Sequence, residues 1–216
     1  MDNFGPIYCD TQHVWWFFHE PVNTLTNFAI IFAAVIAYVY IRRNTQQPPV
    51  DALMLAALTV MNGVGSLLWH GLRAPWALPL DVVPAVLFVF LLAYAWARRM
   101  YGIMAGVGIT LAFVVLLRVS DDVGSIFNLP FPVPIFGSVL LIGLVLVYLT
   151  WRRYGVTLAR FAAGVLAIGL AAAVFRVVDL SVCAYIPFGT HFMWHILLAL
   201  GAFMSAVFLV RLSQQR

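Results

Sequence analysis

The chain has 216 residues, of which 64% are apolar and only 9% are charged, and its mean hydropathy is +0.99. Soluble domains average about 45–50% apolar and about 25% charged residues, so this composition excludes a soluble enzyme, a secreted domain, a disordered chain and a nucleic-acid-binding module. The net charge is +4 and the sequence contains no lysine. Two cysteines are too few for a disulfide scaffold or a cysteine-based zinc finger.

Seven apolar segments are long enough to cross a bilayer, which takes about 20 residues in a helix. The breaks between them are arginine pairs, proline-containing turns and one longer loop, predicted from Ser120 to Pro134, in which Asp121 and Asp122 are solvated. No internal repeat or long linker divides the chain, so a single domain over 1–216 is expected. The predicted spans, in chain order, are 21–42, 51–72, 78–97, 101–118, 134–151, 158–178 and 190–211.

The arginines predict the orientation of these spans. Nine of the twelve fall on one side, whereas Arg73, Arg118 and Arg176 fall on the other. Because cytoplasmic loops carry the excess of basic residues, the predicted fold is an all-α integral membrane protein with its N-terminus outside and its C-terminus in the cytoplasm. The nine are Arg42, Arg43, Arg98, Arg99, Arg152, Arg153, Arg160, Arg211 and Arg216.

The polar residues of the predicted spans gather at one depth. Charged and titratable side chains are costly in hydrocarbon unless they are paired, and those that occur there usually mark function. With the predicted topology, six of them lie at the outer ends of the first, second, third and seventh spans. The sequence therefore predicts a polar site in the outward half of the bundle. Its residues are Glu20, Ser66, His70, Asp81, His191 and His195.

The spacing of these residues predicts a metal site. Ser66 and His70, like His191 and His195, are four residues apart, so each pair lies within about 40° on one helix face. A histidine pair on one helix with a third histidine from a neighbour supplies three imidazoles, the ligand set of many catalytic zinc ions; imidazole also suits copper, iron and nickel. Asp81 would deprotonate a water at this site, and Ser66 would donate to that water or to a developing oxyanion.

Two other pairs each allow two interpretations. Arg176 and Asp179, three residues apart at the end of the sixth span, either form an ion pair that stabilises the helix end, or Arg176 steers a substrate head group. Cys9 and Cys183 are both expected outside the membrane. In an oxidising compartment a disulfide between them would pin the N-terminal segment over the bundle; the alternative is two free thiols.

Three segments together resemble the alkaline ceramidase family. Residues 20–27, EPVNTLTN, resemble that family's E-x-x-N-T-x-S/T-N pattern at the start of the first helix. Residues 63–84 are similar to its G-x-G-S-x3-H-x10-D-x-x-P pattern, and residues 191–197, HFMWHIL, to its H-x-x-W-H-I-L pattern. The wider superfamily includes seven-span progestin and adiponectin receptors of similar site design. The fourth and fifth spans carry no matching motif.

The resemblance implies an intramembrane zinc amidase whose substrate is ceramide. It maps the three zinc ligands onto His70, His191 and His195, and the aspartate and serine that contact the water at the zinc onto Asp81 and Ser66. These are the five residues that the spacing argument selects.

The family's calcium site is matched less well. An acidic cluster ahead of the first helix binds calcium in that family, and only Asp10, Gln12 and Glu20 correspond to it here. Ca²⁺ is therefore a secondary expectation, held by Asp10 and Glu20. The alternative for Glu20 is a cap of the helix N-terminus, where a carboxylate meets the helix dipole.

The functional hypothesis is a zinc-dependent amidohydrolase that cleaves ceramide or a related N-acyl lipid to a sphingoid base, or another amine, and a fatty acid. The alternative is a receptor-like seven-helix membrane protein with a structural zinc site. The expected partner is a membrane lipid substrate, with no nucleic acid and no obligatory protein partner. The short loops and the all-arginine pattern favour a bacterial inner membrane, with the active site facing the outer, periplasmic side.

Overall fold

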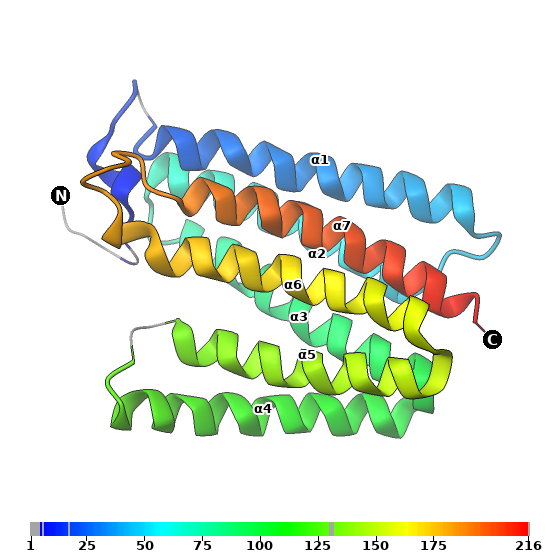
Figure 1. Cartoon of the computed structure of the whole chain (residues 1–216). Helices are drawn as coiled ribbons and strands as arrows, with labels where there is room; N and C mark the ends of the chain where they lie inside the picture. Colours follow the sequence, from blue (N-terminus) through cyan, green and yellow to red (C-terminus); the bar gives the residue numbers. More distant parts are fainter. Residues whose placement is uncertain (1–4, 6, 17, 130–131, 216) are drawn as a thin grey trace.

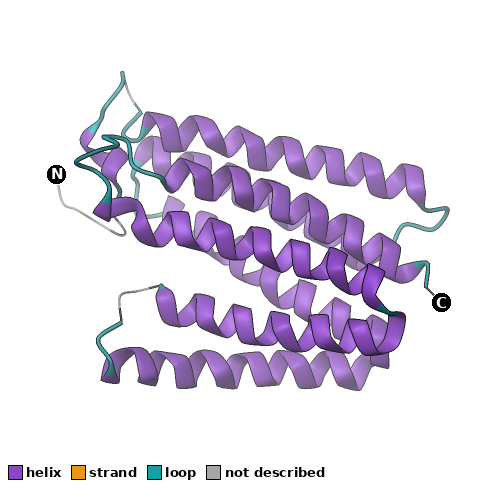
Figure 2. Cartoon of the chain, viewed as in Figure 1, coloured by secondary structure: helices purple, strands orange, loops and turns teal. Residues whose placement is uncertain are grey.

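The structure, a computed structural model, describes residues 5, 7–16, 18–129 and 132–215. Within these ranges, seven helices are long and apolar enough to cross a membrane, which confirms the predicted number of spans. The helices run side by side, with loops confined to the two ends of the bundle (Figure 1, Figure 2). They are α1 (Pro21–Asn44), α2 (Val50–Leu72), α3 (Ala77–Tyr101), α4 (Ile103–Ile126), α5 (Val133–Tyr154), α6 (Val156–Val178) and α7 (His191–Ser213), with short 3-10 turns at Cys9–Gln12 (η1) and Asp179–Ser181 (η2).

The predicted loop after the fourth span is wrong at its start, because α4 continues to Ile126. Asp121 and Asp122 therefore lie in the helix, on its exposed surface, rather than in a solvated loop. No proline interrupts residues 119–126, and the Asp121 and Asp122 side chains extend into the surroundings without disturbing the helical backbone. The helix therefore continues past the point where the apolar run ends. The remaining helix ends differ from the predictions by a few residues, since helical hydrogen bonding outlasts the apolar stretch.

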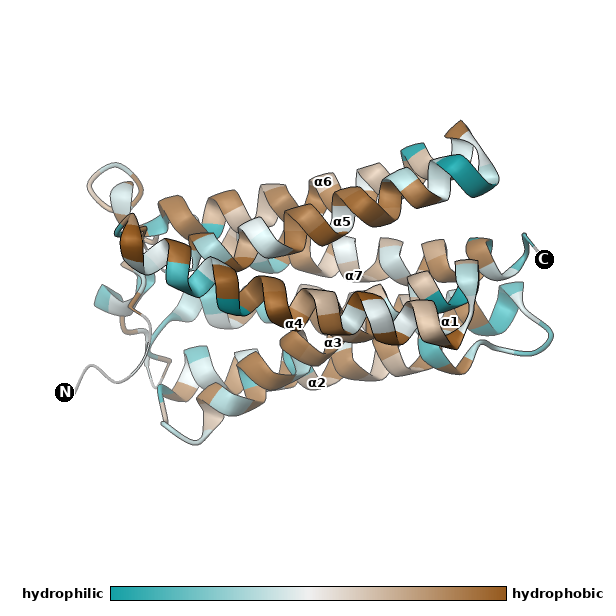
Figure 3. Ribbon diagram, turned by 90° about the horizontal axis from the view of Figure 1, so that it is seen from below, coloured by the Kyte–Doolittle hydropathy of each residue, from teal (hydrophilic) through white to brown (hydrophobic). Residues whose placement is uncertain are grey.

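The helices form a closed ring in which chain neighbours are in contact and α7 packs against α1. Helix α7 also contacts α2 and α3, and α3 also contacts α5, so α3 and α7 lie nearest the centre of the bundle. Hydrophobic residues dominate the long middle of the helices, and hydrophilic residues concentrate toward the ends (Figure 3).

The two halves of the bundle have different interiors. Toward the arginine-rich end, Trp96, Met100 and Phe208 belong to a buried apolar core. Toward the other end, buried polar side chains replace that core. The N-terminal segment and the α6–α7 loop both lie at this polar end (Figure 1).

Candidate metal centre

The three predicted histidines come together at the polar end of the bundle. His70 lies near the end of α2, whereas His191 and His195 lie in the first two turns of α7. All three are buried, and each offers one ring nitrogen such that the three donor atoms lie within 4.8 Å of one another. Among the residues that the structure describes, this is the one cluster of histidine, cysteine or carboxylate donors with metal-binding geometry.

Helix α1 and the residue that immediately precedes it, Glu20, contribute no histidine but orient two of them. The Glu20 Oε2 atom lies 2.5 Å from Nδ1 of His70. The Thr26 hydroxyl donates to backbone carbonyls of its own helix and lies 2.9 Å from Nδ1 of His195. Because the Thr26 proton is used in the helix, its oxygen accepts from the His195 Nδ1–H group. This tautomer leaves the other nitrogen of His195 with a lone pair for a metal, and Glu20 does the same for His70.

Two histidine nitrogens of the site lack hydrogen-bond partners, as expected of nitrogens that bind a metal ion. His70 Nε2 and His191 Nδ1 are buried and have no hydrogen-bond partner. Buried nitrogens are normally satisfied, and an imidazole nitrogen with a free lone pair in a three-histidine cluster is a typical metal ligand. The residues present therefore fit a transition metal ion, and neutral imidazoles alone do not decide which one.

The start of α7 is held in place by Asp179 of η2. One carboxylate oxygen of Asp179 accepts from the backbone N–H groups of Thr190, at 2.7 Å, and His191, at 2.8 Å. The turn before α7 needs glycine at position 189, where φ is +69° and a Cβ atom would lie 2.1 Å from the Asp179 carboxylate. Asp179 is thus a helix cap, so the predicted ion pair with Arg176 is wrong.

Asp81 is close enough to His70 to interact with it electrostatically, but it is not one of the three clustered donors. The Asn62 amide donates to the Asp81 backbone carbonyl at 2.7 Å and approaches its carboxylate at 3.4 Å. The Ser66 hydroxyl also hydrogen-bonds to this carboxylate. These contacts need close packing of α2 on α3, since a Cβ atom on Gly65 would lie 2.0 Å from the Leu80 carbonyl oxygen. The structure therefore brings Asp81 and Ser66 together, and their predicted roles toward a bound water stay predictions.

The Glu20 side chain does not cap α1. Besides His70, it contacts the Arg73 guanidinium at 3.1 Å and accepts from the Thr11 hydroxyl at 2.8 Å. Burial would raise the pKa of the Glu20 carboxyl, but the hydrogen bond from His70 and the charge of Arg73 outweigh burial and lower it. Glu20 thus links one histidine of the cluster to a cation at the end of α2.

Asp10, rather than Glu20, caps the N-terminus of α1. Its Oδ2 atom accepts from the Asn23 N–H group at 2.9 Å, and burial raises the pKa of this carboxyl. The Oδ1 atoms of Asp10, Asn23 and Asn27 are buried without a partner. Such oxygens are calcium-type ligands, so calcium binding at Asp10 and Glu20 stays a prediction.

The N-terminal segment covers the metal centre. Cys9 and Cys183 form a disulfide, the first of the two states considered from the sequence, and the second oxygen of Asp179 accepts from the Cys9 N–H group at 3.1 Å. Next to Cys9, the buried Tyr8 ring stacks on His191 with 4.0 Å between ring centroids. The segment is therefore attached both to the α6–α7 loop and to one of the three histidines.

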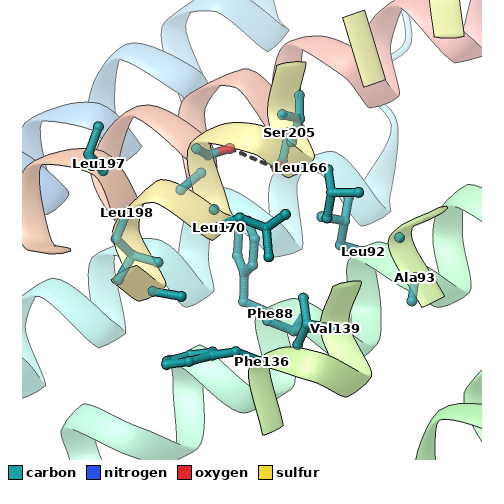
Figure 4. Close-up of a pocket in the computed structure, with 18 of the residues that line it drawn as sticks. Phe88, Leu92, Ala93, Phe136, Val139, Leu166, Leu170, Leu197, Leu198 and Ser205 are labelled. Carbon is teal, nitrogen blue, oxygen red and sulfur yellow. Dashed lines mark hydrogen bonds between the residues drawn. The ribbon is translucent and has the colours of Figure 1, made fainter. Parts of the chain in front are cut away.

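A mostly apolar cavity of about 210 Å³ lies inside the bundle, next to residues that flank the site. Asn62, which holds Asp81, lines it, as do Ala85, one turn after Asp81, and Trp194, next to His195. Its walls come mainly from α3, α5, α6 and α7, and Figure 4 shows several of these side chains converging on the space. The labelled lining residues are Phe88, Leu92, Ala93, Phe136, Val139, Leu166, Leu170, Leu197, Leu198 and Ser205.

Three residues of the site were not predicted from the sequence: Tyr8, Thr26 and Asn62. Thr26 lies in the 20–27 segment and one turn from Asn23, so the motif pointed to its helix face without assigning it a partner. Asn62 precedes Ser66 by one turn, and polar i, i+4 spacing within an apolar helix was the available signal. Nothing local to Tyr8 marks it, because only the fold of the N-terminal segment brings it to His191.

The fold and site together define a multi-pass helical membrane protein with a buried three-histidine cluster beside an aspartate. The chain matches no protein-family model, and no curated protein matches it. Any more specific assignment therefore depends on the chemistry of the site.

Proposed function

We propose that this protein is an intramembrane zinc-dependent hydrolase that cleaves the amide bond of ceramide or a related N-acyl lipid. The observation that carries the proposal is a carboxylate, Asp81, positioned by Asn62 and Ser66 beside three histidines. Asn62 also lines an apolar cavity inside the bundle. A structural metal site is closed by its ligands and needs no such carboxylate.

The site residues have separate roles in the proposed reaction. Zinc, when bound, would supply a Lewis acid that polarises the amide carbonyl and lowers the pKa of water. Asp81 would accept a proton from the attacking water at its carboxylate and return it to the leaving nitrogen. The Ser66 hydroxyl would donate to the carbonyl oxygen as negative charge develops there.

The cavity supports a lipid substrate. It is apolar along most of its wall, and its lining includes Asn62, which holds Asp81, and Trp194, which is next to His195 in the chain. An acyl chain in the cavity would therefore bring its carbonyl carbon to the site, and the cavity walls would exclude water from the rest of the chain. We further propose a bacterial inner membrane with the site toward the periplasm, from the positive-inside pattern.

The test is fatty acid release from N-acyl lipids, ceramide first, by the purified full chain in nanodiscs, read by mass spectrometry. Asp81→Asn should retain metal yet lose at least about 100-fold in turnover, because a positioned general base is worth about that much. His195→Ala should lose the metal itself, measured by elemental analysis. Asp121→Asn, an exposed carboxylate change on α4, is the matched control and should retain full activity.

Two results would contradict the proposal. Full activity of Asp81→Asn would remove the aspartate from the reaction. A metal-loaded wild type that releases no fatty acid from any N-acyl lipid would reject the hydrolase and favour the receptor-like alternative with a structural metal.

A further inference from the structure

Arg176 is a cation close to the metal centre that the proposed reaction does not use. It lies in the last turn of α6, partly buried, with its guanidinium carbon 4.6 Å from the centre of the Tyr8 ring. Tyr8 in turn stacks on His191 at 4.0 Å. One aromatic ring therefore separates this positive charge from a residue of the histidine cluster.

No carboxylate of the described residues forms an ion pair with Arg176. The nearest acidic residue along the chain, Asp179, is occupied by the backbone N–H groups of Cys9, Thr190 and His191. Glu20 is likewise paired with another arginine, Arg73. Basic residues at membrane depth usually pair with an anion. The N–H groups of Arg176 are therefore available to bind an anion from outside the described part of the chain.

The position of Arg176 determines which part of a substrate would meet it. Ala173, one helical turn before Arg176, is the last residue of α6 that lines the apolar cavity, so Arg176 lies one turn beyond the rim of that cavity. An acyl chain would extend inward from the rim, away from Arg176. An anion at Arg176 would therefore belong to the amine portion of the substrate.

We propose that Arg176, supported by the Tyr8 ring, binds a carboxylate on the amine portion of the substrate. The substrate class is then an N-acyl amino acid rather than a neutral amide such as ceramide. A planar guanidinium binds a carboxylate with two parallel N–H···O hydrogen bonds, and it also stacks on an aromatic face. The inference rests on the proposed function, because it assumes that an amide reaches the histidine cluster.

The balanced reaction would be hydrolysis. The oxygen of water bonds to the acyl carbon, the C–N bond breaks with its electron pair going to nitrogen, and that nitrogen takes up a proton. The products are a fatty acid and an amino acid, whose carboxylate Arg176 would hold until release.

The test compares N-oleoyl glycine with N-oleoyl ethanolamine. The two differ only at the end of the amine portion, where the glycine conjugate has a carboxylate and the ethanolamine conjugate has a CH2OH group. Both are given to the metal-loaded full chain in nanodiscs of neutral phosphatidylcholine. We expect wild type to prefer the glycine conjugate in kcat/KM by about tenfold or more, the range of a charge-assisted hydrogen bond. Arg176→Gln should reduce this ratio to about one, and Arg176→Lys should retain part of it. The ratio is internal to each preparation, so partial misfolding does not affect it.

A binding measurement separates this inference from the proposed function. In the Asp81→Asn background, Arg176→Gln should weaken equilibrium binding of N-oleoyl glycine by about tenfold. Carboxylate-dependent binding without hydrolysis by wild type would support the anion site and reject the hydrolase. Hydrolysis with no preference, or a preference that survives in Arg176→Gln, would overturn the role of Arg176 and retain the hydrolase. Loss of the preference when anionic phospholipid is added to the nanodiscs would assign Arg176 to a lipid phosphate instead, and would also overturn the proposal.

Discussion

At the scale of single residues, the metal centre depends on hydrogen bonds that fix how two of its imidazoles present their nitrogens. Glu20 and Thr26 both act on Nδ1, of His70 and His195 respectively; Glu20 immediately precedes α1 and Thr26 lies in its first turns. A ligand held in this way loses little orientational freedom when a metal binds. Helix α1 is thus part of the site although it supplies no ligand.

Thr26→Val tests this role of α1. Valine has nearly the same shape but no hydroxyl, so His195 loses the Thr26 acceptor and keeps only its hydrogen bond to the Asn23 backbone, which holds the ring less firmly. We expect metal affinity to fall by about 10–100-fold, the usual effect of losing such a partner. Competition against a metal-binding indicator measures it.

Thr26→Ser is the matched control, because serine keeps the hydroxyl, and it should bind metal nearly as tightly as wild type. Equal affinities of the valine variant and wild type would show that the hydrogen bond between Thr26 and His195 does not orient the ligand.

Part of the residue-scale picture could be predicted from the sequence. His70, His191 and His195 could be grouped because helical spacing and depth are read directly along the chain. Asp179 could not be assigned correctly. Its i, i+3 spacing from Arg176 suggested an ion pair. In the structure, the Asp179 carboxylate instead accepts hydrogen bonds from three backbone N–H groups of two other segments.

At the scale of elements, the contact between α2 and α3 decides whether Asp81 meets the site. Asn62 and Ser66 hold Asp81 from α2. They reach it because Gly65 lets the two backbones approach closely at Leu80. A small residue at a close helix crossing is common in membrane bundles.

Gly65→Ala should therefore separate α2 from α3. Its Cβ atom would meet backbone atoms at 2.0–2.7 Å, which cannot move away as a flexible side chain would. We expect a loss of about 1–3 kcal/mol in stability, typical of overpacking, together with a loss of turnover as Asp81 is displaced. Thermal unfolding in detergent and the fatty acid release assay measure the two effects.

Gly108→Ala on α4 is the control, because nothing lies within 4 Å of the added Cβ atom. It should be neutral or slightly stabilising, since alanine favours a helix over glycine. If Gly65→Ala behaved like Gly108→Ala, the close contact between α2 and α3 would not be required.

At the scale of the whole molecule, a disulfide joins segments that are 174 residues apart in sequence. It fastens the N-terminal segment to the loop between α6 and α7, with Tyr8 held against His191. The start of the chain and the last helix are thereby linked at the polar end of the bundle (Figure 1). One cysteine pair is therefore a covalent attachment of the segment that covers the histidine cluster.

Reduction of this disulfide should lower the melting temperature of the purified protein and speed the loss of bound metal to a chelator. A cross-link that closes a long loop restricts the unfolded chain, and its removal also frees the segment that covers His191. Differential scanning fluorimetry and chelator kinetics, with and without reductant, measure both effects.

The double variant Cys9→Ser/Cys183→Ser is the control for reductant. It should resemble the reduced wild type and show no further response. If reductant changed neither the melting temperature nor the rate of metal release of the wild type, the disulfide would have no stabilising role.

The sequence alone determined the features that depend on composition and local spacing. Seven spans follow from hydropathy, and the common depth of His70, His191 and His195 follows from where each lies in its span. Helix ends were less predictable, since α4 continues through Asp121 and Asp122, where apolarity stops but helical hydrogen bonding does not.

Only the tertiary structure decided which faces meet. The sequence could not show that Thr26 reaches His195, because this contact depends on α1 and α7 being neighbours in the ring. Nor could it place Tyr8 between Arg176 and His191, since the N-terminal segment folds back over the bundle to do so. The physical reason is that hydrophobicity and helical periodicity act along the chain, whereas a functional site is set by packing between segments that are far apart in it.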